Sequence, residues 1–227
     1  MYVTEPPSPQ RDILVIASGG LDSAVAIALA DCNCERLHLV AFNYGQKHVR
    51  ELESFTALKH YYDTHAEIFD ISDPLSPSTA LTSAASVALT ANPPAPLLPR
   101  TWKPGRNLLM LAAAVPLAYE LGCTIIAGGW HAEDYPGYPD CRPNFLLAAE
   151  DAIQQALATP IAVWAPLLNL GKRQIVALGI QLEVPFELTW SCYEGGPIPC
   201  GKCDSCIRRA AAFEANKLKD PALKEKT

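Results

Sequence analysis

The chain has 227 residues and a mass of 24.5 kDa, which fits one α/β domain with additions, or one domain plus a small module. Hydrophobic residues make up 49% of the sequence, so a sizeable core can form and disorder is not expected. A formal net charge of −6 disfavours RNA or DNA as a partner. Apolar stretches are too short to span a membrane, and residues 1–11 are polar rather than a signal peptide, so we expect a cytoplasmic protein.

Predicted strands and helices alternate along most of the chain. Apolar runs predict strands at residues 13–17, 37–42, 66–69, 124–127 and 161–164. Helical patterns are expected at residues 24–30, 47–62, 107–120, 144–157, 171–181 and 204–216. Pro116 should bend its helix or end a turn of it. The alternation predicts a Rossmann-like, doubly wound α/β fold, with a parallel sheet that binds ligands at the carboxyl ends of its strands.

The pattern also predicts two parts. Residues 1–185 are expected to form a nucleotide-binding α/β domain, and residues 186–227 a cysteine-bearing element packed on it. Residues 72–104 are rich in Pro, Ser, Thr and Ala without a clear period, which predicts a long loop or lid within the first part.

A glycine-serine sequence, Ser18-Gly19-Gly20-Leu21-Asp22-Ser23, stands between the first predicted strand and its helix. Two glycines let the backbone approach an anion closely, and N–H groups at a helix start point toward it. The serine hydroxyls add donors, and Asp22 can hold a Mg²⁺ ion. A helix start with a glycine-rich turn and serine caps is an equally ordinary interpretation of these six residues.

Four of the eight cysteines, Cys192, Cys200, Cys203 and Cys206, follow the spacing Cys-x7-Cys-x2-Cys-x2-Cys. Four thiolates in this pattern predict one tetrahedral Zn²⁺ per chain, and a site filled by protein ligands is structural. Lys202, Arg208 and Arg209 lie close enough in sequence to offset the negative charge of such a centre. The alternative is redox disulfides or unrelated thiols. The remaining cysteines at 32, 34 and 123 are expected to be ordinary packed or semi-exposed residues.

Two shorter polar segments have a functional and a structural interpretation. Residues 43–48 (Asn-Tyr-Gly-Gln-Lys-His) follow the second predicted strand and can reach a nucleotide base or ribose, or form a plain turn and cap. Arg106 follows Pro104-Gly105 and can pair with phosphate or carboxylate. The neighbouring Asn107 is equally typical of a helix cap.

The densest polar segment spans residues 128–143 and follows the fourth predicted strand. It combines aromatic rings that can stack on a purine-like ring, carboxylates that can accept hydrogen bonds from a guanidine-like edge, and Arg142, which can meet an anion. A loop tied together by its own salt bridges is the structural alternative. Lys172, at the start of a later helix, is a candidate phosphate contact, although most such lysines are merely solvated.

Together these segments resemble the 7-cyano-7-deazaguanine synthase family of queuosine biosynthesis, the QueC type, within the PP-loop ATP pyrophosphatase superfamily. The matching pieces, in the order of the family, are Ser18–Ser23, residues 44–48 with Glu51, residues 104–107, residues 137–142, Pro166-Leu167 with Lys172, and Ser191 through Cys206. The first piece is shared across the superfamily. Residues 137–142 and the four cysteines are much more particular.

The resemblance implies ATP-dependent conversion of 7-carboxy-7-deazaguanine and ammonia to a nitrile, through an acyl adenylate and an amide, with release of AMP and pyrophosphate. It implies structural Zn²⁺, Mg²⁺, ATP as co-substrate, an adenine nucleotide alpha hydrolase-like fold and a homodimer. The expected catalytic residues are Ser18, Asp22, Ser23 and Lys172. ATP is expected to contact Ala17, Ser18, Gly19, Gly20, Leu21, Asp22, Ser23, Ala24, Tyr44, Gln46 and Arg106. The expected acceptor contacts are Arg106, Asn107, Asp134, Tyr138, Asp140 and Arg142, where Asp134 or Asp140 reads the deazaguanine edge and Arg106 or Arg142 meets the carboxylate.

The chain departs from the family pattern at Pro136, Asn144 and Trp130-His131, positions that bear on acceptor recognition rather than on ATP binding. One alternative is therefore a defence-associated ligase with another acceptor. A second is a PP-loop tRNA-modifying enzyme such as a thiolase, which needs a basic surface and a reactive cysteine, with Cys141 as the candidate. A third is a nucleotide-binding or zinc-binding module without catalysis.

Overall fold

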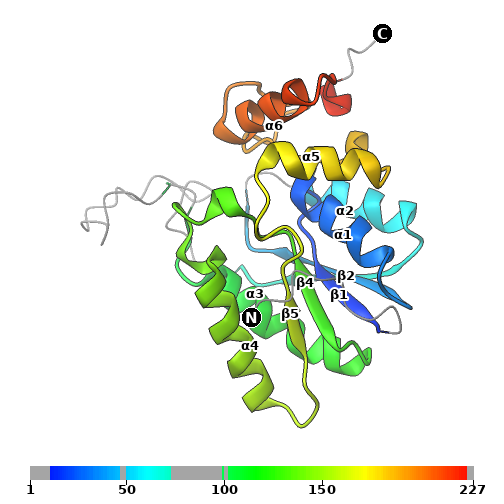
Figure 1. Cartoon of the computed structure of the whole chain (residues 1–227), viewed down its shortest axis with the longest axis vertical. Helices are drawn as coiled ribbons and strands as arrows, with labels where there is room; N and C mark the ends of the chain where they lie inside the picture. Colours follow the sequence, from blue (N-terminus) through cyan, green and yellow to red (C-terminus); the bar gives the residue numbers. More distant parts are fainter. Residues whose placement is uncertain (1–10, 47–49, 73–98, 100–101, 224–227) are drawn as a thin grey trace.

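A parallel five-stranded sheet forms the centre of the protein (Figure 1). The computed structural model describes residues 11–46, 50–72, 99 and 102–223. The strands are β1 (Ile13–Ile16), β2 (Leu37–Asn43), β3 (His65–Asp70), β4 (Ile125–Gly128) and β5 (Ala162–Trp164), in the spatial order β3-β2-β1-β4-β5. The order reverses between β1 and β4, which is where doubly wound sheets place their ligands.

Helices cover both faces of the sheet. One face carries α1 (Leu21–Asp31), α2 (Arg50–Tyr61) and α5 (Lys172–Gln181), and the other carries α3 (Arg106–Glu120) and α4 (Pro143–Ala156) (Figure 1). Side chains along a strand alternate between the two cores: Ile13 and Val15 face the α1 side, whereas Leu14 faces α3 and α4. Buried parallel strands need apolar residues on both faces, which explains the continuous apolar runs of the sequence.

The last helix, α6 (Asp204–Ala215), packs beside α5 (Figure 1). Its Phe213 ring meets Phe186 of the short helix η3 (Phe186–Leu188) edge to face, with centroids 5.2 Å apart. Buried Arg209 forms an ion pair with Asp220 at 2.7 Å, and its predicted contribution of charge beside the cysteines stays a prediction. Phe213 belongs to the same hydrophobic cluster as Ile13 and Val15 of β1. The division of the chain into two parts at residue 185 stays a prediction.

The predicted fold class is confirmed, and each predicted strand and helix lies within a few residues of its position in the structure. The short 3₁₀ helices of the described residues were not predicted from sequence: η3 and also η1 (Ala132–Asp134), η2 (Pro139–Cys141) and η4 (Pro221–Leu223). Pro116 was expected to bend its helix or end a turn; α3 continues through it to Glu120, so it does not end the helix, and the bend stays a prediction. Most of the predicted loop at residues 72–104, and the first residues of the helix predicted from residue 47, lie outside the described residues. Within the described part of the chain, none of the helices combines the length and hydrophobicity that crossing a membrane requires.

Gly19 fixes the loop between β1 and α1 against α2. Its φ of +86° is one that L side chains rarely adopt, and an added Cβ would stand 2.1 Å from the Glu51 carbonyl oxygen and 2.6 Å from the Phe55 nitrogen. The neighbouring Trp190 N–H donates to the Gly19 carbonyl at 3.0 Å. The loop is thus held by close backbone contacts on two sides.

We expect Gly19→Ala to destabilise the protein by about 3 kcal/mol, from left-handed backbone strain together with overpacking. Gly122→Ala is the matched control, because Gly122 has a similar φ of +72° but open space where its Cβ would lie. It should cost only the strain, about 1 kcal/mol. Urea unfolding measures both variants. Equal losses in the two would show that the contact with Glu51 contributes nothing.

Candidate active site and metal centre

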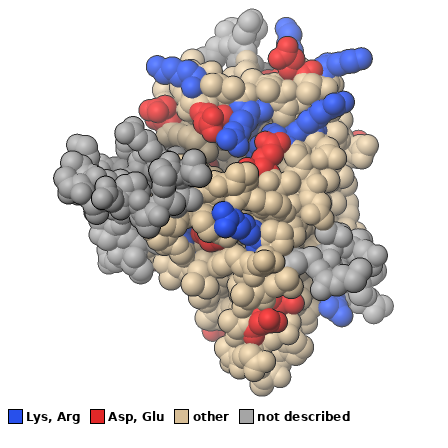
Figure 2. Space-filling model, turned by 60° about the vertical axis from the view of Figure 1, so that its left-hand side comes forward, with Lys and Arg blue, Asp and Glu red and all other residues tan. Residues whose placement is uncertain are grey.

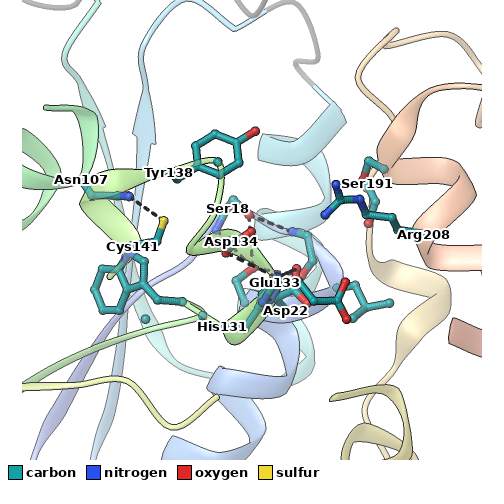
Figure 3. Close-up of a pocket in the computed structure, with 18 of the residues that line it drawn as sticks. Ser18, Asp22, Asn107, His131, Glu133, Asp134, Tyr138, Cys141, Ser191 and Arg208 are labelled. Carbon is teal, nitrogen blue, oxygen red and sulfur yellow. Dashed lines mark hydrogen bonds and ion pairs between the residues drawn. The ribbon is translucent and has the colours of Figure 1, made fainter. Parts of the chain in front are cut away.

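A cavity of about 740 Å³ opens at the carboxyl ends of β1 and β4. Its walls come from the glycine-serine loop, the start of α3, the segment after β4, the start of α5 and the region around α6. Figure 3 shows Tyr138 and Asn107 on one side of this cavity, Ser191 and Arg208 on the other, and Asp22 with His131 and Glu133 between them. The topology therefore brings together most of the motifs that the sequence singled out.

The glycine-serine loop forms a compact, self-bonded turn at the start of α1. The Ser23 hydroxyl donates to the Gly20 carbonyl at 3.0 Å and accepts from the Ser18 N–H at 3.3 Å. The Gly20 N–H donates to the Ser18 hydroxyl at 3.1 Å. Because the N-cap residue Gly20 has no side chain, the first N–H groups of α1 carry no side-chain cap. This helix start has the properties of an anion site.

Asp22 and Lys172 form an ion pair at the edge of that loop. The Lys172 ammonium donates to both carboxylate oxygens of Asp22, at 2.7 and 2.6 Å. Burial raises the pKa of Asp22, but the Lys172 ammonium, with a smaller effect of the nearby His131, outweighs it and holds the pKa below its usual value. Asp22 is therefore ionised at neutral pH. The sequence predicted these two residues as catalytic candidates without predicting their contact.

Asp134 is a second carboxylate on the same wall, and its environment acts in the opposite direction. Burial raises the pKa of Asp134, and the negative charge of Asp22 adds to this effect, against His131, Lys172 and Arg106. Glu133 points elsewhere, since its Oε1 accepts the backbone N–H of Lys172 at 2.6 Å. This contact ties the segment after β4 to the start of α5. From sequence, His131 was named only as a departure from the family pattern, and Glu133 was included only as one carboxylate of the segment dense in polar groups.

Aromatic and cationic side chains lie near the end of β2 and the start of α3. Tyr44 is buried at the end of β2, and burial raises its pKa to about 12. The Arg106 guanidinium and the Lys103 ammonium each lie 5.7 Å from the centroid of its ring. Tyr138 contributes a second aromatic side chain to the cavity. This wall can accept a flat aromatic group that carries an anion.

Six predicted contacts lie outside the set of described residues that line the cavity: Ala17, Gly19 and Ala24 at the glycine-serine loop, and three polar residues, Asp140, Arg142 and Gln46. Asp140 accepts the backbone N–H of Asn107 at 3.0 Å and so caps the start of α3. Arg142 is exposed, and its Nε donates to the Tyr135 carbonyl at 3.0 Å. Gln46 accepts from the Tyr44 N–H at 2.8 Å and fixes its own turn. These contacts favour structural roles for Asp140, Arg142 and Gln46. Their roles in binding ATP or the acceptor stay predictions.

Cys141 is buried on the wall beside Asn107, whose side-chain amide lies 3.3 Å from its sulfur. Burial, together with the nearby Asp134 and Asp140, raises the pKa of this thiol. A neutral thiol is a poor nucleophile. This environment disfavours the reactive cysteine that the thiolase alternative requires.

The four predicted metal ligands converge beside α6. The sulfur atoms of Cys192, Cys200, Cys203 and Cys206 all lie within 4.8 Å of one another. Backbone N–H groups of Lys202 and Cys203 lower the pKa of Cys200 to about 6, which favours a thiolate. Bonds of about 2.3 Å to one tetrahedral ion would place the sulfurs about 3.8 Å apart. The four free cysteines form a candidate metal site.

This metal site is directly connected to the cavity. Trp190 donates its backbone N–H to Gly19 and its indole N–H, at 2.9 Å, to the carbonyl of Cys192. Beyond the cysteines, α6 carries Arg208 to the cavity wall.

On the face shown in Figure 2, basic and acidic side chains of the described residues lie interspersed, unlike the basic stripe that binds nucleic acid.

A parallel sheet of this order, with a glycine-serine loop leading into α1, defines the PP-loop class of nucleotide-binding proteins. The fold is similar to that of the U34-tRNA thiolase NcsA from Methanococcus maripaludis, with a TM-score of 0.51, 16% identity, and coverage of 91% of this chain and 65% of that chain. At this level of identity the likeness concerns the fold alone.

The family is narrower than the class. The model of the family "Queuosine biosynthesis protein QueC" matches residues 12–217, and the chain belongs to this family. The chain is 40% identical over 216 residues to 7-cyano-7-deazaguanine synthase from Synechococcus sp. (strain CC9605), covering 92% of this chain and 95% of the relative. It is 37% identical over 222 residues to the Thermoplasma acidophilum enzyme of the same name, covering 96% and 93%. The predicted family is confirmed.

Proposed function

We propose that this chain is an ATP-dependent 7-cyano-7-deazaguanine synthase. It would convert 7-carboxy-7-deazaguanine and ammonia to the nitrile through an acyl adenylate and an amide. The supporting observation is that one cavity contains both the glycine-serine loop and the aromatic and acidic segment after β4. An anion site next to a surface for a flat heterocycle is what joining ATP to such an acid requires.

The loop at Ser18 and the start of α1 are the proposed site of the β- and γ-phosphates of ATP. Open N–H groups, two serine hydroxyls and the helix dipole all favour negative charge there. Arg208 of α6 adds a cation on the side of the cavity away from Tyr138 and Asn107 (Figure 3). Asp22 is the carboxylate suited to Mg²⁺, which would neutralise phosphate charge when bound. The α-phosphorus is then left facing the acceptor wall.

The acceptor would lie against the segment after β4, between the side chains of Tyr138 and Asp134. Asp134 is the carboxylate of that segment placed to accept hydrogen bonds from the deazaguanine edge, in preference to Asp140, which caps α3. Arg106, with Tyr44 beneath it, is the cation suited to the carboxylate of the acceptor.

The chemistry requires positioning more than a protein nucleophile. A carboxylate oxygen attacks the α-phosphorus, and the bond to pyrophosphate breaks. Ammonia then forms the C–N bond, the C–O bond to AMP breaks, and one N–H proton is lost. The amide oxygen then attacks the α-phosphorus of a second ATP, and a second pyrophosphate leaves. The C–O bond to AMP breaks, and the two remaining N–H protons are lost, which leaves the nitrile. The proposed role of the protein is to hold two anions together and to stabilise departing pyrophosphate.

We also propose that the four cysteines hold one structural Zn²⁺, because the sulfur spacing suits a single tetrahedral ion with all four positions filled by protein. The remaining partners in this proposal are small molecules. The enzyme would act in the cytoplasm, without nucleic acid, and as a homodimer by resemblance to the family.

The test is incubation with ATP, Mg²⁺, ammonium and 7-carboxy-7-deazaguanine, with mass spectrometry of the products. We expect the nitrile, with two AMP and two pyrophosphate for each nitrile formed, and no nitrile when ammonium is omitted. Cleavage of labelled ATP to ADP and orthophosphate would overturn the adenylation chemistry. AMP without amide or nitrile would overturn the acceptor and favour the defence-associated alternative.

A further inference from the structure

His131 is a buried titratable side chain on the cavity wall that the proposed chemistry does not use. Only 3% of the residue is exposed, although it stands in a polar segment directly after β4. It occupies the N-cap position of η1, where its Nδ1 accepts the backbone N–H of Glu133 at 3.3 Å. A buried imidazole so close to two carboxylates needs an explanation beyond packing.

The contact at Nδ1 fixes where the ring carries its proton. A neutral imidazole has one donor and one acceptor nitrogen, and Nδ1 accepts from Glu133, so the proton resides on Nε2. Nε2 lies 3.4 Å from Asp134 Oδ2 and 3.7 Å from Asp22 Oδ2. Nε2 therefore lies near two carboxylates that come from different elements of the fold.

Lys172 completes the arrangement around the ring. Its ammonium lies 3.3 Å from Nε2, but it donates at 2.6 and 2.7 Å to the two oxygens of Asp22. Asp22 thus already has a strong donor, whereas Asp134 lies nearer to the imidazole. The Nε2–H group therefore stabilises the Asp134 carboxylate more than the Asp22 carboxylate.

We propose that His131 is a positioning residue that orients the Asp134 carboxylate toward the acceptor and links it to the Asp22–Lys172 pair of the phosphate loop. This inference rests on the proposed function, in which Asp134 reads the edge of the acceptor. The imidazole touches no reacting atom in this role. Its removal changes how the acceptor is held, more than how ATP is held.

The test compares His131→Leu with His131→Gln. Leucine removes the donor, whereas the glutamine amide nitrogen reaches close to the Nε2 position and can still donate. We expect the leucine variant to raise the KM for the acceptor about tenfold, the loss of one polar contact to a charged group. Its KM for ATP should change by less than about threefold, and the glutamine variant should recover most of the affinity for the acceptor. His60→Leu, an exposed residue on α2, is the control.

A spectroscopic measurement separates this inference from the proposed function. ¹⁵N NMR of the imidazole rings in the wild-type protein should show His131 protonated on Nε2, with a shift on Asp134→Asn. A proton on Nδ1, an equal loss in the leucine and glutamine variants, or a parallel rise in both KM values would overturn the proposal. Wild-type protein that makes no nitrile would overturn the proposed function, and the NMR result would still decide the His131 contact.

Discussion

Asp22→Asn is expected to lower kcat at least about 100-fold, the effect of losing an electrostatic group at the proposed site of adenylation. The carboxylate stands at the start of α1, where the phosphate chain is proposed to bind, and Lys172 is directed at both of its oxygens. The amide keeps the size of the side chain but removes its charge. Mg²⁺ would lose a ligand, and the Lys172 ammonium would lose its counter-charge.

The same substitution should also affect stability, so the two effects must be separated. Leaving a partly buried ammonium without its counter-charge costs about 2 kcal/mol. The double variant Asp22→Asn with Lys172→Met removes both charges and should recover most of this loss in urea unfolding. Its rate of AMP formation should remain as low as that of the single variant. Recovery of activity together with stability would show that the pair is structural only.

The sequence predicted the site best where chemistry depends on a short local pattern. The loop from Ser18 to Ser23 and the spacing of the four cysteines each specify their own local geometry, and the structure places both as expected. Strand positions followed from apolar runs, because a parallel sheet buries both of its faces. Local patterns of this kind need no knowledge of distant contacts.

The structure added what depends on contacts between distant residues. Asp140 and Asp134 are alike in sequence context, but one caps α3 through Asn107 and the other lines the cavity. Likewise, Lys172 meets Asp22 across 150 positions of sequence, and Glu133 reaches the start of α5. The choice between such equivalent residues is made by the tertiary fold, which spacing along the chain does not encode.

Cys203→Ser should release the metal and weaken ATP binding as well. The reason is the path from the cysteine cluster to the glycine-serine loop: the carbonyl of Cys192 accepts the indole N–H of Trp190, and Trp190 donates its backbone N–H to Gly19. Cys203 is also the N-cap residue of α6, the helix that carries Arg208 to the cavity. Loss of the metal would free both segments at once.

We therefore expect Cys203→Ser to lower the melting temperature by more than about 10 °C, the range for loss of a structural metal site. Its affinity for ATP should fall about tenfold or more, as the preorganised loop is lost. Elemental analysis gives zinc and iron per chain, and calorimetry gives the ATP dissociation constant. Cys32→Ser, which removes an exposed thiol outside the cluster, should retain one zinc and normal affinity. If Cys203→Ser lost its zinc but bound ATP normally, the metal would stabilise α6 without supporting the phosphate loop. Iron in the wild-type protein would contradict the assignment of zinc.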